Sequence, residues 1–136
     1  MDIKELYYEA DTRKHQQIVA ELMIEVAKKI MDRAMKHDAS KLEEPERSKY
    51  IEPVFALNSE NVPFGSDRYK ELTAQMGEGW DHHKLSNDHH IRFFEPHCIR
   101  SMNMFALLEM MCDWIAAAKR NGNEPARALD FIIGTP

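Results

Sequence analysis

The chain contains few of the residues that build disulfide frameworks, phosphate-binding loops or nucleophile motifs. It has two cysteines, Cys98 and Cys112, which form no CxxC pair, so a reducing compartment is favoured. Its five glycines are scattered, and none belongs to a phosphate-binding glycine loop. No GxSxG sequence is present, and neither cysteine lies in a recognisable Cys-His context. These absences argue against P-loop chemistry and against nucleophilic catalysis.

Long apolar runs and basic runs are also missing. The longest apolar stretch, from about Met104 to Ala118, is interrupted by acidic residues and is too short to span a bilayer. The mixed, charged segment from Met1 to Glu9 lacks the apolar core of a signal peptide. The net charge is −5, and Lys and Arg are spread along the chain, which argues against nucleic acid as a partner. We therefore expect a cytoplasmic protein with no membrane partner.

The residues that are present predict one soluble helical domain over residues 1–136. Charged residues make up 30% and hydrophobic residues 43% of the 136, enough for a core without disulfides. Apolar residues recur at helical spacing from Asp11 or Thr12 to about Met35. Ser66 can cap a short helix, and an apolar helix, expected to be buried, follows from Ser101 to about Arg120. No strand pattern is convincing, so the fold class is all-α, a compact helical bundle.

Two histidine pairs indicate a metal site. Five of the seven histidines lie between residues 82 and 97, including the pairs His82-His83 and His89-His90. The turn residues 86–88 separate the pairs, so we expect them to converge from either side of a turn. Not all four can bind one ion. We expect one histidine of each pair to be a ligand, whereas the others would bind substrate phosphate or transfer protons.

The sequence His37-Asp38-Ala39-Ser40-Lys41 provides further candidates. Imidazole and carboxylate groups both suit divalent transition metals, and His37 and Asp38 adjoin a helix end. Asp113 is a carboxylate in the apolar helix, where a buried charge must be paired or bind a metal. Glu109 lies four residues earlier and is expected to support a ligand or face solvent. Lys41, three residues past Asp38, could neutralise charge on a phosphate.

His15 is the remaining candidate, and its geometry leaves two alternatives open. It lies on the apolar stripe of the first helix, and 22 residues of helix turn it only ~40° from His37. The same 22 residues separate the two histidines by roughly 33 Å along a straight helix. Either the helix breaks, near residues 28–32, or His15 is not a ligand.

The order of these residues resembles the HD-domain superfamily of metal-dependent phosphohydrolases, all-α proteins with ligands in the order H…HD…H…H…D. The segment from His37 to Lys41 is similar to the HD-x-x-K form of its two-metal cyclic-dinucleotide phosphodiesterase branch. Nearly the whole chain also resembles a small uncharacterised family of phages and bacteria. That resemblance is carried by residues 37–42, 45–46, 64–70, 82–83, 87–90 and 108–114. Members of that family usually follow the second pair with Pro-Glu-His, where this chain has Ile91-Arg92-Phe93.

The resemblance implies a metal-dependent phosphohydrolase that acts on a small nucleotide or another phosphoester. It would use one or two divalent ions, among which Mn, Fe, Co, Zn and Mg are not distinguished. The implied metal ligands are His15, His37, Asp38, His83, His89 and Asp113, and the implied catalytic residues are Lys41, His82 and His90. The alternatives are an HD-type di-iron oxygenase and a non-catalytic phage-type helical protein with a structural metal. The oligomeric state is not predicted.

Overall fold

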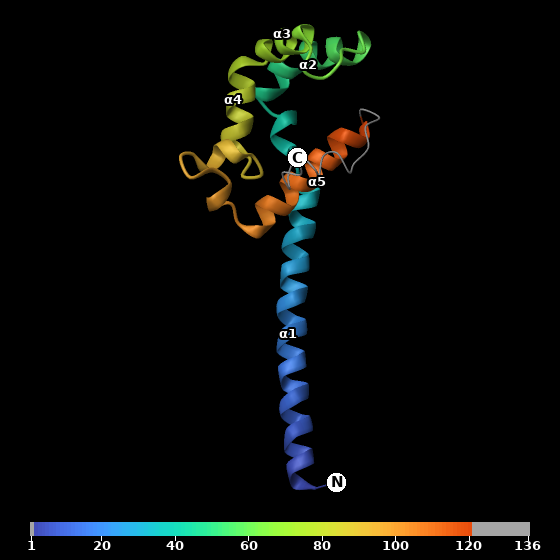
Figure 1. The fold of residues 1–136 in the computed structure, drawn as a ribbon, viewed down its shortest axis with the longest axis vertical. Helices are drawn as coiled ribbons and strands as arrows, with labels where there is room; N and C mark the ends of the chain where they lie inside the picture. Colours follow the sequence, from blue (N-terminus) through green and yellow to red (C-terminus); the bar gives the residue numbers. More distant parts are fainter. Residues whose placement is uncertain (1, 121–136) are drawn as a thin grey trace, which may run out of the picture. The chain divides into compact units, whose positions relative to one another are not determined.

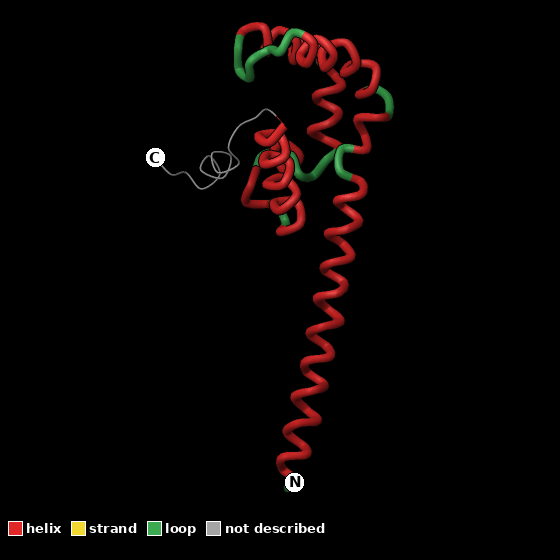
Figure 2. The backbone as a smooth tube through the Cα atoms, turned by 90° about the vertical axis from the view of Figure 1, so that its right-hand side faces the viewer, coloured by secondary structure: helices red, strands yellow, loops and turns green. Residues whose placement is uncertain are grey.

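The computed structural model describes residues 2–120, and every regular element in this range is helical (Figures 1 and 2). The all-α prediction is therefore confirmed. No described helix combines the length and hydropathy that a membrane span requires. The elements are α1 (Ile3–Lys36), η1 (Ala39–Leu42), α2 (Glu46–Ser59), α3 (Asp67–Gln75), α4 (Gly77–Ser86), η2 (Ile91–Phe94), η3 (Cys98–Ser101) and α5 (Met104–Arg120), where η denotes a short 3-10 helix.

The chain divides into two units, the first ending at His37 and the second beginning at Asp38. The first unit consists of α1, which starts well before the predicted Asp11 or Thr12. The backbone N–H of Asp2 donates a hydrogen bond of 2.9 Å to the Glu5 carboxylate, a contact that stabilises the early start. The helix is continuous through residues 28–32, where the sequence allowed a break.

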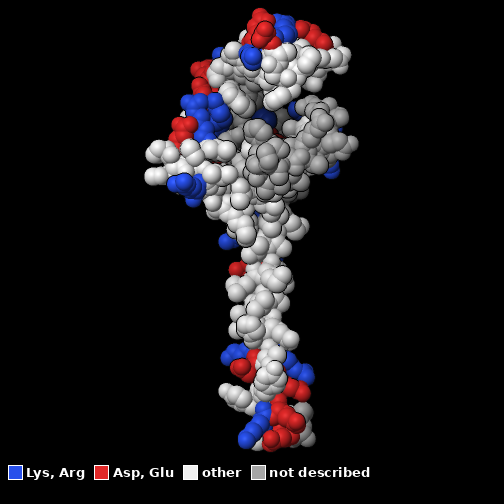
Figure 3. Space-filling model, in the orientation of Figure 1, with Lys and Arg blue, Asp and Glu red and all other residues white. Residues whose placement is uncertain are grey.

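The apolar stripe of α1 is exposed along the helix. No residue of α1 is buried, and Leu22 and Met23 are 57% and 67% exposed. Charged side chains on the visible face gather near the N-terminal end of α1 and leave its middle largely uncharged (Figure 3). A helix in a globular protein normally buries such a stripe, and α1 has no second element in its own unit. The single-domain prediction therefore stays a prediction, because α1 has no core of its own.

The second unit is assembled around α2 and α4. Helix α2 packs against α3, α4 and η1, and α4 also packs against η1 and η2 (Figure 1). Gly79 allows α4 to approach α2 closely, because a Cβ atom there would lie 2.8 Å from Cβ of Lys49. Among residues 2–120, the buried apolar side chains of the core all belong to this unit, and they include Tyr50, Leu72, Met76, Ala106 and Met110.

Two predicted helices fit the structure differently. Ser66 caps α3, since its hydroxyl accepts a hydrogen bond of 3.1 Å from the backbone N–H of Tyr69. The last helix was expected to be buried on all sides, and this prediction is wrong. Only Ala106 and Met110 are buried in α5, whereas Met104 is 68% exposed. The apolar composition predicts a helix correctly, but the burial of a helix depends on how many neighbouring elements cover it.

Candidate metal centre

Asp38 lies at the centre of the candidate site. It precedes η1 with φ +56°, in the left-handed region that Asp tolerates better than most residues. Its Oδ2 atom accepts a hydrogen bond from Nζ of Lys41. Its Oδ1 atom lies 3.3 Å from Nε2 of His83 and 3.4 Å from Nε2 of His89. One carboxylate therefore faces a lysine on one side and two imidazoles on the other.

The spacing of these atoms fits a shared metal ion. Two ligands at about 2.0–2.1 Å from a tetrahedral zinc ion are about 3.4 Å apart. A nitrogen of His90 joins the group, because ligand atoms of Asp38, His83, His89 and His90 all lie within 4.8 Å of one another. The buried Nε2 atom of His90 has no hydrogen-bond partner among the described residues. Burying such an atom is costly, and a bound ion would remove that cost.

Glu46, the first residue of α2, orients the ring of His83. Its Oε2 atom lies 2.8 Å from Nδ1 of His83, and both side chains are buried. The amide nitrogen of Asn87 lies 3.2 Å from the same Nδ1, but this amide already donates to the hydroxyl of Ser40 and the carbonyl of His83. The short contact is therefore a hydrogen bond from Nδ1–H to the carboxylate, which leaves the lone pair on Nε2.

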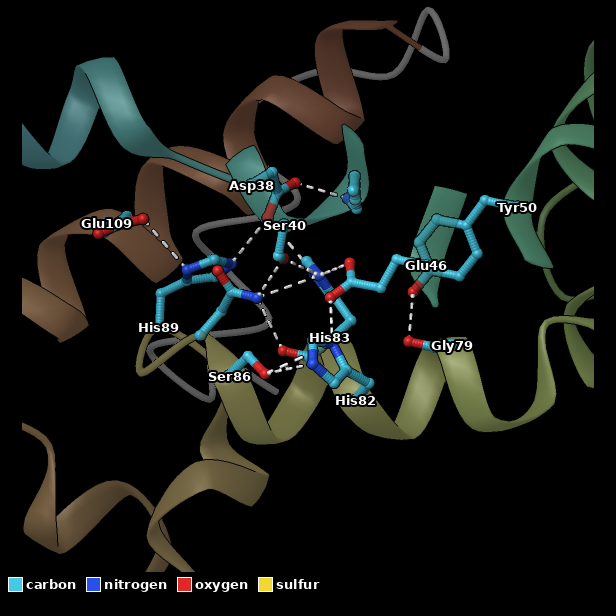
Figure 4. Close-up of polar contacts among 12 residues, drawn as sticks. Asp38, Ser40, Glu46, Tyr50, Gly79, His82, His83, Ser86, His89 and Glu109 are labelled. Atoms are coloured by element: carbon cyan, nitrogen blue, oxygen red, sulfur yellow. Dashed lines mark hydrogen bonds and ion pairs between the residues drawn. The ribbon is translucent and has the colours of Figure 1, made fainter. Parts of the chain in front are cut away.

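Glu109 of α5 has the same relation to His89. Its Oε1 atom lies 3.1 Å from Nδ1 of His89, while Nε2 of that ring faces Asp38 (Figure 4). Histidines that bind metals usually donate their other N–H group to a carboxylate, a carbonyl or water. Two carboxylate–histidine pairs thus point their Nε2 atoms at the same aspartate oxygen.

The surroundings keep the candidate ligands in the form that binds metals. Burial lowers the pKa of His83, and the nearby Lys41 charge acts in the same direction. Burial, followed by the neighbouring His89 and His83 rings, lowers the pKa of His90 to about 4. Desolvation disfavours the charged imidazolium, so these two rings are neutral at pH 7. A neutral imidazole has the free lone pair that a metal ion needs.

Asp113 extends the site beyond the three histidines. It lies on α5, and one of its carboxylate oxygens is within 4.8 Å of an oxygen of Asp38. Asp38 therefore has imidazole nitrogens near one part of its carboxylate and a second carboxylate within reach. The cluster could hold one ion among the histidines and another near the Asp38–Asp113 pair.

The predicted catalytic residues are distributed around this cluster. Lys41 contacts Asp38, and its side chain is 40% exposed. His82 has its Nδ1 atom 2.8 Å from Oε1 of Glu46, and its side chain is 44% exposed. His90 lies within the group of possible ligands, so the second histidine pair offers two candidates where we predicted one. The choice of His83 and His89 as ligands stays a prediction.

The structure does not bring His15 and His37 together. Both belong to the first unit, where His37 follows the last residue of α1 and is half-buried, and His15 is exposed. Because α1 is continuous, the two histidines lie about 33 Å apart along its axis. Of the two alternatives for His15, the helix break is wrong, and these two histidines of one chain cannot share an ion.

The sequence did not point to Glu46, and it left two roles open for Glu109, support of a ligand or exposure to solvent. In the sequence, Pro45-Glu46 indicates only a favourable first helical turn, and nothing in it signals a carboxylate with no exposed surface. The signal for Glu109 was its place four residues before Asp113, on the same helix face. The packing of α2 on α4 places Glu46 beside the histidine pair, a relation that the sequence does not display.

The sequence profile of a protein family matches residues 4–130, a span that includes every candidate ligand. The chain belongs to DUF5662, a family of unknown function. No curated protein and no solved structure gives a significant match. What the site does must therefore be argued from its own geometry.

Proposed function

We propose that the protein is a metal-dependent phosphohydrolase that acts on a small nucleotide or another phosphoester. The observation that carries the proposal is the spacing of 3.3 and 3.4 Å between Oδ1 of Asp38 and two histidine Nε2 atoms. This spacing equals that of neighbouring ligands on one tetrahedral ion, about 3.4 Å. The resemblance of the ligand order to HD-domain phosphohydrolases supports the same function.

The donor atoms indicate the class of metal. Three imidazole nitrogens and one carboxylate oxygen suit Zn, Co, Fe or Mn better than Mg or Ca, which prefer oxygen ligands. When bound, such an ion would polarise a phosphoryl oxygen and make water a stronger acid.

The neighbouring side chains provide the remaining requirements of phosphoester hydrolysis. Asp38 presents both carboxylate oxygens, and the proximity of Asp113 suits a carboxylate shared between two ions. The Lys41 ammonium group is held beside Asp38 and is partly exposed, so it can approach the charge of a phosphate. His82 and Glu46 form a hydrogen-bonded pair that reaches from the buried site to solvent.

A second candidate is a structural metal site without catalysis. It is favoured by the number of donors, because Asp38, His83, His89 and His90 would fill all four positions of a tetrahedral ion. Structural zinc sites are closed in this way, whereas catalytic sites keep one position for water. The two candidates differ in whether phosphate can reach the ion.

Metal analysis followed by activity assays separates them. The full chain would be purified without added metal, analysed for transition metals, and assayed with p-nitrophenyl phosphate, bis-p-nitrophenyl phosphate and nucleotides in the presence of Mn, Fe, Co or Zn. A phosphohydrolase should show metal-dependent turnover that Asp38→Asn abolishes. Tightly bound metal without turnover, together with a Co²⁺ absorption spectrum that inorganic phosphate does not change, would instead identify the structural site.

A further inference from the structure

Each carboxylate oxygen of Glu46 contacts a different histidine. Oε1 lies 2.8 Å from Nδ1 of His82, and Oε2 lies 2.8 Å from Nδ1 of His83. The side chain of Glu46 has no exposed surface, whereas that of His82 is 44% exposed. The contact with His82 therefore lies on the solvent side of the carboxylate, and His83 lies on the buried side.

This arrangement determines where the imidazole protons are. An ionised carboxylate only accepts hydrogen bonds, so each Nδ1 atom that faces Glu46 must carry a proton. The proton on Nδ1 of His83 leaves the lone pair on Nε2, the atom that lies 3.3 Å from Asp38. Without an acceptor at Nδ1, the proton could move to Nε2 and block that nitrogen as a ligand.

We infer that Glu46 is a positioning residue that selects the metal-binding tautomer of His83, and that His82 is an anchor for Glu46 and not a ligand. The inference rests on the metal centre of the proposed function, but it does not require hydrolysis. The group of possible ligand atoms includes His83 and excludes His82, in agreement with this division within the pair. The ligand that the pair helps to bind is a divalent transition metal ion.

Glutamine provides a specific test, because it differs from glutamate in donor and acceptor capacity. A glutamine at position 46 has one oxygen and one NH₂ group, so it can accept a proton from only one of the two histidines. The other histidine would receive an N–H group and would have to carry its own proton on Nε2. When that histidine is His83, metal binding is weakened.

Removing His82 should reverse this effect. In the double variant Glu46→Gln with His82→Ala, the amide oxygen can serve His83 alone, and the NH₂ group can face the solvent that replaces His82. A simple loss of charge or packing at Glu46 would not be reversed by a second truncation. Recovery of metal affinity in the double variant therefore separates tautomer selection from a structural role.

The experiment measures Co²⁺ affinity of the full chain by competition with a chromophoric chelator, with circular dichroism as the test of folding. Glu46→Gln should weaken Co²⁺ binding by about 10- to 100-fold, the range for residues that orient metal ligands. His82→Ala should stay within about 3-fold of wild type, and the double variant should recover to a similar level. The matched control is Glu52→Gln, the same change at an exposed position of α2, and it should leave the affinity unchanged.

Two results with the variants would overturn the inference. One is an equal loss of affinity in Glu46→Gln and in the double variant, and the other is a loss in His82→Ala as large as that in Glu46→Gln. If Glu46→Gln does not fold, ¹⁵N spectra of the metal-free His82→Ala variant decide the question, since His83 must carry its proton on Nδ1. A wild-type chain that binds no Co²⁺ removes the inference, whereas tight binding without phosphoester hydrolysis removes only the proposed function.

Discussion

Helix α1 and the second unit differ in the side chains that they bury. The 34 residues of α1 include a long apolar stripe, yet none of them is buried. In the second unit, the most deeply buried side chains include Glu46, His83 and His89, all of which can ionise. The longest helix therefore has no buried residue, whereas the second unit buries several polar side chains.

The difference shows what amphipathic spacing can predict. Apolar residues every three or four positions make a helix with one apolar face, but they do not identify what covers that face. Buried imidazoles and carboxylates behave otherwise, because each must be satisfied by a specific partner or by an ion. Burial of polar groups is thus the stronger indicator of function. Substitutions of the buried polar groups should therefore have larger effects than substitutions in α1.

Replacing Asp38 should have the largest effect. Asp38→Asn keeps the shape of the side chain, and Asn also tolerates the positive φ of this position, so the fold should survive. The amide would present a neutral group to His83 and His89, and we expect Co²⁺ affinity to fall by more than about 100-fold. Chelator competition measures the affinity, and activity with any reactive phosphoester should vanish with it.

The matched substitution in α1 is His15→Ala. Because His15 and His37 are held about 33 Å apart by the continuous helix, this variant should bind Co²⁺ like wild type. A loss of metal affinity in His15→Ala as large as that in Asp38→Asn would show that the ion is bound at α1. The second unit would then not be the part of the chain that holds the metal centre.

Acid should destabilise the metal-free second unit. Burial lowers the pKa of His90 to about 4 in the folded chain, against 6.5 for an ordinary histidine. Between these values the unfolded chain binds more protons, so the free energy of unfolding should fall as the pH drops from about 6.5 to 4. We expect a loss of about 1–3 kcal/mol from this group.

Urea unfolding at pH 7 and pH 4.5 measures this loss, with His90→Asn as the variant that removes the group. The pH dependence should shrink in His90→Asn and persist in His15→Asn. An unchanged pH dependence in His90→Asn would mean that His90 is not responsible for it.

Sequence reasoning identified the metal candidates better than the packing that supports them. The placement of His82-His83 before a turn is confirmed, because capping residues mark the end of α4 locally. The pair His89-His90 lies within that turn and not after it, since the backbone N–H of His90 donates a hydrogen bond of 3.1 Å to the carbonyl of Asn87. Glu46 could not be found, since its role depends on α2 lying against α4, a contact between segments distant in sequence. The exposure of α5 could not be predicted for the same reason, because composition does not show which elements will pack against a helix.

Gly79→Ala should test the close packing of α2 and α4. Its Cβ atom would lie 2.8 Å from Cβ of Lys49, too close without a shift of backbone. In an exposed helix, replacing glycine with alanine raises the free energy of unfolding by about 1 kcal/mol. Here we expect a net destabilisation of about 1–3 kcal/mol in urea unfolding, together with weaker Co²⁺ binding because Glu46 is displaced.

Ala20→Leu at an exposed position of α1 is the control and should change stability by less than about 0.5 kcal/mol. A stabilised Gly79→Ala would show that α2 and α4 are not in close contact at this position.

Leu22→Gln in the stripe of α1 should have the smallest effect. Leu22 is 57% exposed, and glutamine has nearly the same helix propensity as leucine, so α1 should stay helical. Stability should change by less than about 0.5 kcal/mol, and Co²⁺ affinity should stay within about 2-fold of wild type. Circular dichroism and chelator competition on the same sample measure both quantities. A tenfold loss of Co²⁺ affinity would mean that the stripe supports the metal centre, and the contrast between α1 and the second unit would then be wrong.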